Sequence, residues 1–138
     1  MPSIDEIKKY VTDEIVQDII DTARHGGITF WATEPTDEEL DSLPKGKAWT
    51  IVEGGDDRLF GGEREVDGVH YLNAEDIRGA YAKVLDLDQK YVNRKYHGYV
   101  LQSWIDRDEK HGIDAGIIDA GTADLLVQVA IFGKVRHG

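Results

Sequence analysis

A short segment around a glycine pair combines a cation, an imidazole and two aromatic rings. Arg24 and His25 precede Gly26-Gly27, and Phe30 and Trp31 follow it closely. A guanidinium pairs with anionic groups, and an aromatic ring stacks on a flat or cationic ligand. This pattern predicts the edge of a ligand-binding site, with Arg24 binding an anion and Trp31 stacking on a ring. The alternative interpretation is structural, because cations in the last turn of a helix interact favourably with its dipole.

A polar pair, Asp124 and Gln128, lies within the apolar segment near the end of the chain. Residues four apart share one face of a helix, so we expect the two side chains to lie together beside the apolar face. Such a pair either satisfies backbone groups at the edge of a core or lines a pocket or a subunit contact. Together, the two segments supply the candidate ligand-binding residues: Arg24, His25, Trp31, Asp124 and Gln128.

Residues for nucleophilic chemistry are scarce. The chain has no cysteine, and its serines, Ser3, Ser42 and Ser103, lie outside any Gly-x-Ser-x-Gly turn. The pairs Gly54-Gly55 and Gly61-Gly62 lack the glycine spacing and the lysine of a phosphate-binding loop. The sequence therefore predicts no catalytic residue and no cofactor, although acids near Asp114 and Asp119 leave a hydrolase as an alternative.

Metal-binding patterns are equally weak. None of the histidines has a zinc-site spacing. The best candidate is the stretch from Asp106 to Asp114. A calcium loop that began at Asp106 would require glycine and glutamate where His111 and Ile117 stand. We expect this stretch to be a solvated loop without a metal.

Composition limits the classes of partner. The 138 residues carry a formal net charge of −11, which disfavours direct binding to nucleic acids or to anionic membranes. The 41% apolar residues are sufficient for one core, so we expect a single domain over residues 1–138. Without cysteine, an apolar spanning segment or a signal peptide, the chain is expected to be cytoplasmic. The many aromatic residues also allow a homo-oligomer.

The pattern of apolar residues predicts the elements that position these side chains. Residues 3–25 are predicted to be helical, with a second cap at Thr12 that divides the segment in two. Clustered strands followed by grouped helices indicate the α+β class: a small antiparallel sheet of three to four strands packed against an N-terminal helix and three C-terminal helices. The strands are expected at 28–33, 48–53, 59–66 and 69–72, with a bulge or a loose edge at Gly61-Gly62. The later helices are expected at 74–85, 89–106 and 119–132.

Two motifs resemble those of a known family. Gly26-Gly27-Ile28 with Trp31-Ala32 is similar to a GGIxYWA signature, and residues 119–133 are similar to a DAxxADxxVQxALFG motif. Both occur in small proteins of unassigned activity encoded by tailed phages of actinobacteria. Phe30 and His137 stand where that family often has tyrosine. The resemblance implies a phage origin and brings no catalytic residues with it.

These observations favour a phage-encoded, non-enzymatic binding protein that acts in the cytoplasm of the host cell, in counter-defence. Its expected partner is a host protein, which it would inhibit, or a nucleotide-like small molecule, which it would sequester. The alternatives are an acidic DNA mimic that blocks a nucleic-acid-binding protein, and a small hydrolase. The acids argue against mimicry because Lys and Arg interrupt them, as in Asp106-Arg107-Asp108-Glu109-Lys110.

Overall fold

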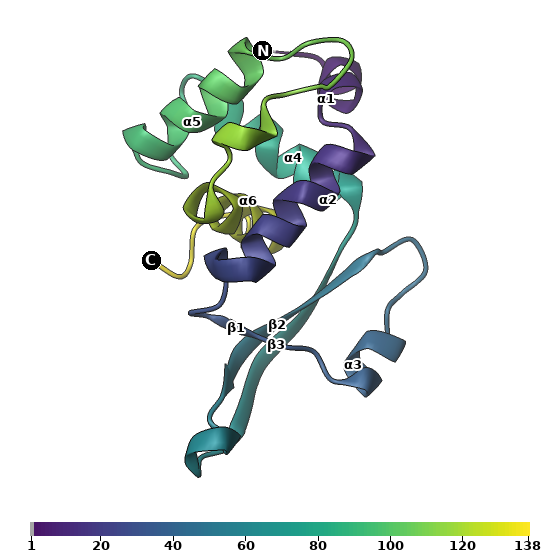
Figure 1. Ribbon diagram of the computed structural model, residues 1–138, viewed down its shortest axis with the longest axis vertical. Coiled ribbons are helices and arrows are strands. Elements are labelled where there is room, and N and C mark those ends of the chain that lie inside the picture. The colour runs from purple at the N-terminus through teal and green to yellow at the C-terminus, as the bar shows by residue number, and fades with distance from the viewer. Residues whose placement is uncertain (1) are drawn as a thin grey trace.

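The computed structural model describes residues 2–138 and has helices at one end and an elongated sheet at the other (Figure 1). This arrangement confirms the predicted α+β class with an antiparallel sheet. Within those residues the α-helices are α1 (Ile4–Tyr10), α2 (Asp13–Thr22), α3 (Asp37–Asp41), α4 (Ala74–Leu85), α5 (Arg94–Ile105) and α6 (Ala120–Phe132). The strands are β1 (Ala32–Thr33), β2 (Trp49–Asp56) and β3 (Arg64–Leu72), and the short turns are η1 (Ala23–Gly27), η2 (Arg58–Phe60) and η3 (Ala115–Ile117).

Local capping sets where the helices begin. The side chains of Ser3, Thr12, Asn73 and Asp119 each accept a hydrogen bond from a backbone N–H in the first turn of the helix that follows. Each bond satisfies a donor that the helix itself leaves unpaired. The predicted division of the N-terminal helical segment at Thr12 is therefore confirmed.

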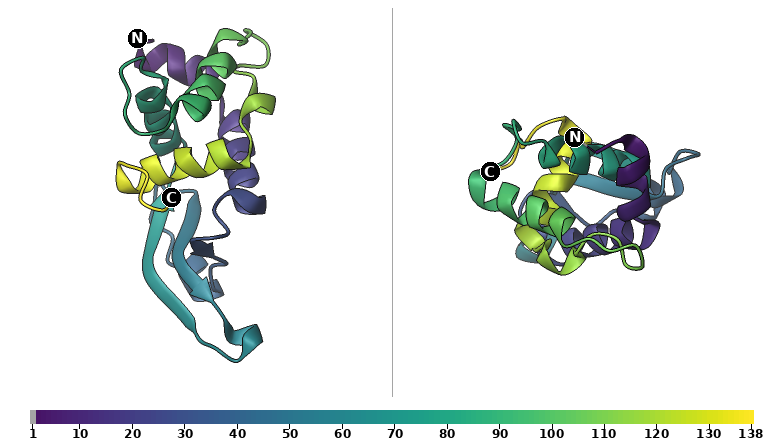
Figure 2. Two further views of the ribbon diagram at one scale, coloured as in Figure 1. Left: turned by 90° about the vertical axis from the view of Figure 1, so that its left-hand side faces the viewer. Right: turned by 90° about the horizontal axis from the view of Figure 1, so that it is seen from above.

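The core lies between the helices and the near end of the sheet. Helix α6 crosses the molecule at this level (Figure 2), and α4, α2, η1 and β3 pack against it. It is buried on most of its circumference, in keeping with its largely apolar sequence. The backbone of η1 lies very close to the backbone of α6 at Gly27, where a Cβ atom would lie 2.4 Å from the Ala120 carbonyl oxygen. Glycine at this position lets η1 pack directly on the start of α6.

The sheet has the order β1-β2-β3, and both pairings are antiparallel. Strands β2 and β3 form a long hairpin that projects away from the helices as an arm (Figures 1 and 2). Its register shifts between Glu53 and Gly54, so a bulge separates the near and far halves of the hairpin. At Gly54, φ is +149° and a Cβ atom would lie 2.0 Å from the Glu65 carbonyl oxygen, a position that requires glycine.

The strand boundaries differ from the predicted ones. The predicted strand 28–33 is reduced to Ala32–Thr33, because residues 28–31 form turns in which Ile28 N–H donates to Ala23 O and Ala32 N–H donates to Ile28 O. Residues 64–72 form one continuous strand instead of the ends of two, and the bulge lies at Glu53/Gly54 instead of Gly61-Gly62. Residues 28–31 form turns in spite of their high β propensity, because the turns bury Ile28 and Trp31 in the core.

Helix α5 begins later than expected. The Gln89 side chain accepts hydrogen bonds from the N–H groups of Tyr91 and Val92, and this turn delays the helix until Asn93 caps it. Helices α4 and α5 are consequently separate elements. No helix within residues 2–138 is both long and apolar enough to cross a membrane.

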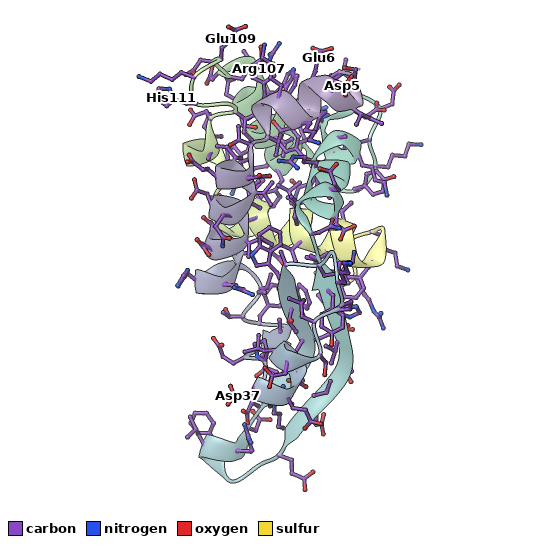
Figure 3. The ribbon with its side chains drawn as sticks, turned by 90° about the vertical axis from the view of Figure 1, so that its right-hand side faces the viewer. Asp5, Glu6, Asp37, Arg107, Glu109 and His111 are labelled. Atoms are coloured by element: carbon purple, nitrogen blue, oxygen red, sulfur yellow. The ribbon has the colours of Figure 1, made fainter. Side chains whose placement is uncertain are left out.

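The helical end of the molecule is strongly charged. Asp5 and Glu6 of α1 lie there near the loop that carries Arg107, Glu109 and His111, whereas Asp37 lies beside the arm (Figure 3). Lys9 Nζ lies 3.2 Å from Glu109 Oε1 and ties α1 to this loop. Acidic and basic side chains therefore occur together at this end of the molecule.

Candidate functional site

Three of the predicted ligand-binding residues converge in the interior. Trp31 Nε1 donates to Asp124 Oδ1 at 2.6 Å, and Gln128 Nε2 donates to the same oxygen at 3.0 Å. All three side chains are buried. Burial raises the pKa of the Asp124 carboxyl above its ordinary value, against the opposing effect of the two donors.

Gln128 also holds the end of the chain. Its Oε1 accepts hydrogen bonds from the N–H groups of Arg136 (2.9 Å) and His137 (2.7 Å), and its Nε2 donates to the His137 carbonyl at 2.9 Å. The His137 ring then stacks on the Trp31 indole, with centroids 5.1 Å apart and an interplanar angle of 4°. His137 thereby takes the stacking position that the sequence assigned to a ligand.

Glu53 of β2 completes this network. Its side chain is 4% exposed; one carboxylate oxygen lies 2.6 Å from His137 Nε2 and the other 3.3 Å from His70 Nε2. Burial by itself raises the pKa of Glu53, but the contacts with His137, His70 and Arg136 outweigh it and hold the pKa below its ordinary value. We call Trp31, Glu53, Asp124, Gln128 and His137 the tail anchor, because their contacts fix residues 136–137 against α6 and β2.

Arg24 and His25 lie apart from the tail anchor, on a cavity of about 590 Å³ between η1, β1, α3 and β2. His25 Nδ1 lies 2.6 Å from the Asp21 carbonyl oxygen, so this nitrogen donates and Nε2 is left for another partner. Arg24 is exposed and forms no ion pair with any of residues 2–138. The structure thus divides the five predicted residues between a buried network and an open cavity.

The acids considered for hydrolysis or metal binding have local structural partners. Asp114 accepts a hydrogen bond from Gly116 N–H, and Asp119 accepts from both the N–H and the hydroxyl of Thr122. Asp108 accepts from the backbone of His111 and closes a turn. Over the described residues 2–138, no cluster of three or more His, Asp or Glu side chains has a geometry that would hold a metal ion.

The tip of the β2–β3 arm is a surface that the sequence analysis did not single out. Leu59 is 93% exposed and Phe60 is 88% exposed, side by side in η2 at the far end of the arm. The sequence feature that could have indicated this surface is the position of the apolar pair between Asp56-Asp57 and Gly61-Gly62. Asp and Gly are typical of turns, and connecting segments run over the surface, so side chains between such flanks are expected to be exposed.

The tip has a defined conformation. Asp57 N–H donates to Glu63 O at 3.0 Å, and Gly62 N–H donates to Asp57 O at 2.8 Å. Arg58 donates two side-chain hydrogen bonds to the Asp56 carboxylate, at 2.9 and 2.7 Å. This bidentate pairing, with the Arg58 backbone N–H, lowers the pKa of Asp56 to about 2. Leu59 and Phe60 are therefore presented on a hydrogen-bonded turn.

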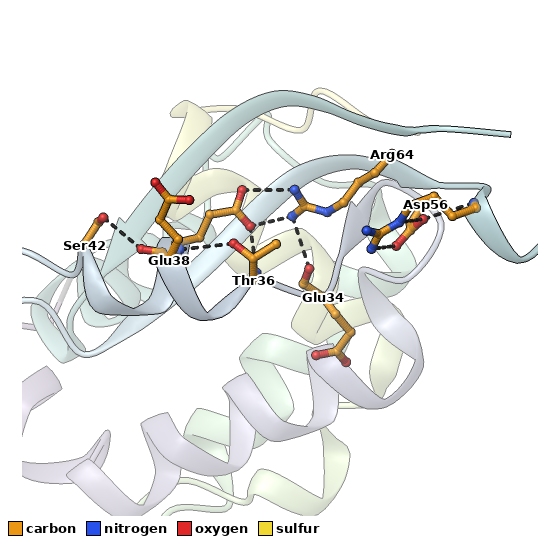
Figure 4. A network of polar contacts seen from close by, with 8 residues as sticks. Glu34, Thr36, Glu38, Ser42, Asp56 and Arg64 are labelled. Carbon is orange, nitrogen blue, oxygen red and sulfur yellow. Dashed lines mark hydrogen bonds and ion pairs between the residues drawn. The ribbon is translucent and has the colours of Figure 1, made fainter.

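Helix α3 braces the arm from the side (Figure 4). Arg64 of β3 donates to both carboxylate oxygens of Glu39 and, at 3.3 Å, to the Glu34 carbonyl oxygen. Both members of the Arg64–Glu39 pair are largely buried, with side chains 14% and 17% exposed. Arg64, together with the Thr36 backbone, holds the pKa of Glu39 below its ordinary value. These contacts restrict the direction in which the arm projects.

The arm carries an excess of negative charge. Residues 54–68 include five acids and two arginines. Arg58 and Arg64 are paired with Asp56 and Glu39. Four further carboxylates are exposed and form no ion pair within the described part of the chain: Asp57, Glu63, Glu65 and Asp67. An apolar tip thus stands on an acidic stem.

No family model, no curated protein and no solved structure matches this chain.

Proposed function

We propose that this chain is a non-enzymatic binding protein whose arm inserts Leu59 and Phe60 into an apolar pocket on a partner protein. One observation carries the proposal: two adjacent large apolar side chains are 93% and 88% exposed at the end of a braced hairpin. Singly exposed apolar residues are common, but an adjacent pair at a projecting tip is typical of an interaction site. Aromatic anchors of this kind dominate the binding energy of many interfaces.

Ordering of the arm before binding supports the same function. The Arg58–Asp56 and Arg64–Glu39 contacts hold the tip and the stem in the free protein. A surface that is already ordered loses less conformational entropy on association. A larger share of the free energy gained by burying Leu59 and Phe60 is then available for affinity than in a flexible loop.

The charge of the arm indicates the kind of pocket. Asp57, Glu63 and Glu65 are exposed, form no ion pair among residues 2–138 and flank Leu59 and Phe60 in the chain. The complementary surface is therefore an apolar pocket bordered by Lys or Arg. A host protein is the partner consistent with the phage-like motifs, and inhibition of a host defence protein is the function we propose for the complex.

The proposal is tested by replacing Phe60 with the photo-crosslinking residue p-benzoylphenylalanine and irradiating host-cell extract. Phe30 is the matched control position, because it is also an exposed phenylalanine (62%) but lies outside the arm. The partner is the protein that crosslinks from position 60 and not from position 30. Its affinity is then measured for the parent chain, Phe60→Ala and Phe30→Ala.

We expect Phe60→Ala to weaken binding roughly 30-fold, equivalent to about 2 kcal/mol, and Phe30→Ala to leave it unchanged. An exposed residue contributes little to folding, so both variants should melt at the parent temperature. The proposal is overturned if no protein crosslinks from position 60 or if Phe60→Ala binds the partner normally. Binding that depends steeply on salt but not on Phe60 would instead indicate a DNA mimic.

A further inference from the structure

A second cavity lies among the helices, at the C-terminal end of α4. It has a volume of about 650 Å³ and is bounded by α4, the loop that follows it and Lys134 beyond the end of α6. Ala82 and Tyr91 line it, and Leu87 is exposed in the same loop, so part of the surface here is apolar. Ligand pockets have volumes of about 300–1,000 Å³, and this cavity has room for two large side chains.

Lysines give this cavity a basic border: Lys83, Lys90 and Lys134. Each is exposed and forms no ion pair with any of the described residues 2–138. Asp86 and Asp88 also line the cavity, and Asp86 accepts a hydrogen bond from the Asp88 N–H at 2.9 Å. Residues 83–95 carry four basic residues and two acids, whereas the whole chain has 16 against 27. We call this cavity the basic pocket.

The basic pocket has the properties that the arm requires of its partner. Leu59 and Phe60 are exposed and apolar, and the acids that flank them form no ion pair among residues 2–138: Asp57, Glu63 and Glu65. Such a tip is complementary in charge to an apolar cavity with a basic border. The arm projects away from the helices that form the pocket (Figure 2), so the tip cannot reach the pocket of its own chain. A second copy is needed to bring the two surfaces together.

We propose that the basic pocket of one copy binds the arm tip of a second copy, with Leu59 and Phe60 in the cavity and their acidic flanks beside its lysines. This contact rests on the docking role proposed for the tip, but not on the identity of the host partner. Because the tip and the pocket are different surfaces, the contact is heterologous and joins one copy to the next. Self-association and binding of the partner protein then compete for the same tip.

The first measurement is sedimentation velocity of the purified full chain over a range of concentrations. The mass should rise from that of a monomer to that of at least two copies as the concentration increases. The association should weaken as salt is added, because exposed charges are screened. Phe60→Ala should weaken it about tenfold or more, since an aromatic anchor contributes much of the binding energy.

The pocket is tested by reversing the charge of its three lysines in one variant, Lys83→Glu/Lys90→Glu/Lys134→Glu. The matched control reverses three other exposed lysines that lie outside the pocket and form no ion pair among residues 2–138: Lys8→Glu/Lys45→Glu/Lys110→Glu. The two variants have the same net charge, so general repulsion between copies is equal in both. The pocket variant should associate at least tenfold more weakly than the control variant. Both should melt at the parent temperature, because the replaced side chains are exposed.

Photo-crosslinking then identifies the contact. Chains with p-benzoylphenylalanine at position 60, unlabelled and ¹⁵N-labelled, are mixed and irradiated with no other protein present. Crosslinks between labelled and unlabelled chains should map to residues 82–91 or to Lys134. The same residue at position 30 is the control and should give no such crosslink.

Three results would overturn the proposal. The first is a chain that stays monomeric up to about 1 mM at low salt. The second is association of the pocket variant as strong as that of the control variant. The third is a monomeric chain that binds single-stranded DNA through the three pocket lysines, which would assign the pocket to nucleic acid.

The outcomes for the pocket and for the host partner are separable, because the pocket variant keeps an intact tip. A monomeric chain that crosslinks a host protein from position 60 would overturn only the contact between copies. A chain that self-associates through the basic pocket but crosslinks no other protein in host-cell extract would overturn only the proposed host partner.

Discussion

Replacing Gln128 with leucine tests whether the tail anchor contributes to the stability of the whole chain. Gln128 is fully buried, and its amide makes three hydrogen bonds to the backbone of residues 136–137 and one to the Asp124 carboxylate. Leucine has a similar volume, so the substitution removes these bonds without leaving a large cavity. The change isolates the polar contribution of one side chain.

The magnitude follows from the partners. A neutral hydrogen bond contributes about 1 kcal/mol and a bond to a charged group about 2 kcal/mol. The four bonds set an upper limit of about 5 kcal/mol on this scale. Residues 136–137 can separate from α6 and be solvated, which recovers part of this loss. We therefore expect the free energy of unfolding to fall by about 3 kcal/mol, which lowers the melting temperature of a chain this size by about 10 °C.

The assay is thermal and urea unfolding followed by circular dichroism, with amide hydrogen exchange at His137. Exchange at His137 should become fast in Gln128→Leu, because its N–H loses the bond to Oε1. Gln102→Leu is the control, since Gln102 makes the same kind of bond to an Asp four residues away but is exposed. A melting temperature within about 1 °C of the parent, with His137 still protected, would refute the proposed role of the anchor.

Other predictions concern the same anchor and the arm. Glu53→Gln should make the free energy of unfolding less dependent on pH in the acid range. The pKa of Glu53 is lowered from 4.5, so its contribution is present above that pH and disappears as pH falls through the folded-state value; equal acid sensitivity in both proteins would contradict this. Gly54→Ala should destabilise the chain by about 2 kcal/mol or more in urea unfolding, because of its backbone conformation and the Glu65 carbonyl. At the neighbouring Gly55, where a Cβ atom meets nothing within 4 Å, alanine should be tolerated, and equal effects at the two sites would argue against the bulge. Trp31→Phe should remove the Nε1 donor to Asp124 and raise the Asp124 pKa further, measurable by ¹³C NMR titration; an unchanged pKa would show that this bond is unimportant.

The helices were largely predictable because their signals are local. A capping side chain such as Thr12 or Asn73 acts on a backbone N–H three residues away, so sequence and structure carry the same information. The pairing of Asp124 with Gln128 was predictable for the same reason, since helical periodicity places residues four apart on one face. The order of strands and helices was likewise enough for the fold class.

Long-range contacts could not be predicted in this way. Trp31 and Asp124 are 93 residues apart, and Glu53 and His137 are 84 apart. Nothing local indicates that the His137 ring covers Trp31. The residues around Trp31 also have a strong β propensity, yet burial of Ile28 and Trp31 favours turns there.

The sequence by itself determined the α+β class, the helix starts and which residue types were available for binding, because these depend on composition and on near neighbours. Only the tertiary structure decided what those residues do. It placed Trp31, Asp124 and Gln128 in a buried anchor and left Arg24 and His25 on a cavity. It also carried Leu59 and Phe60 to the tip of an arm, because burial and exposure are set by which distant segments pack together.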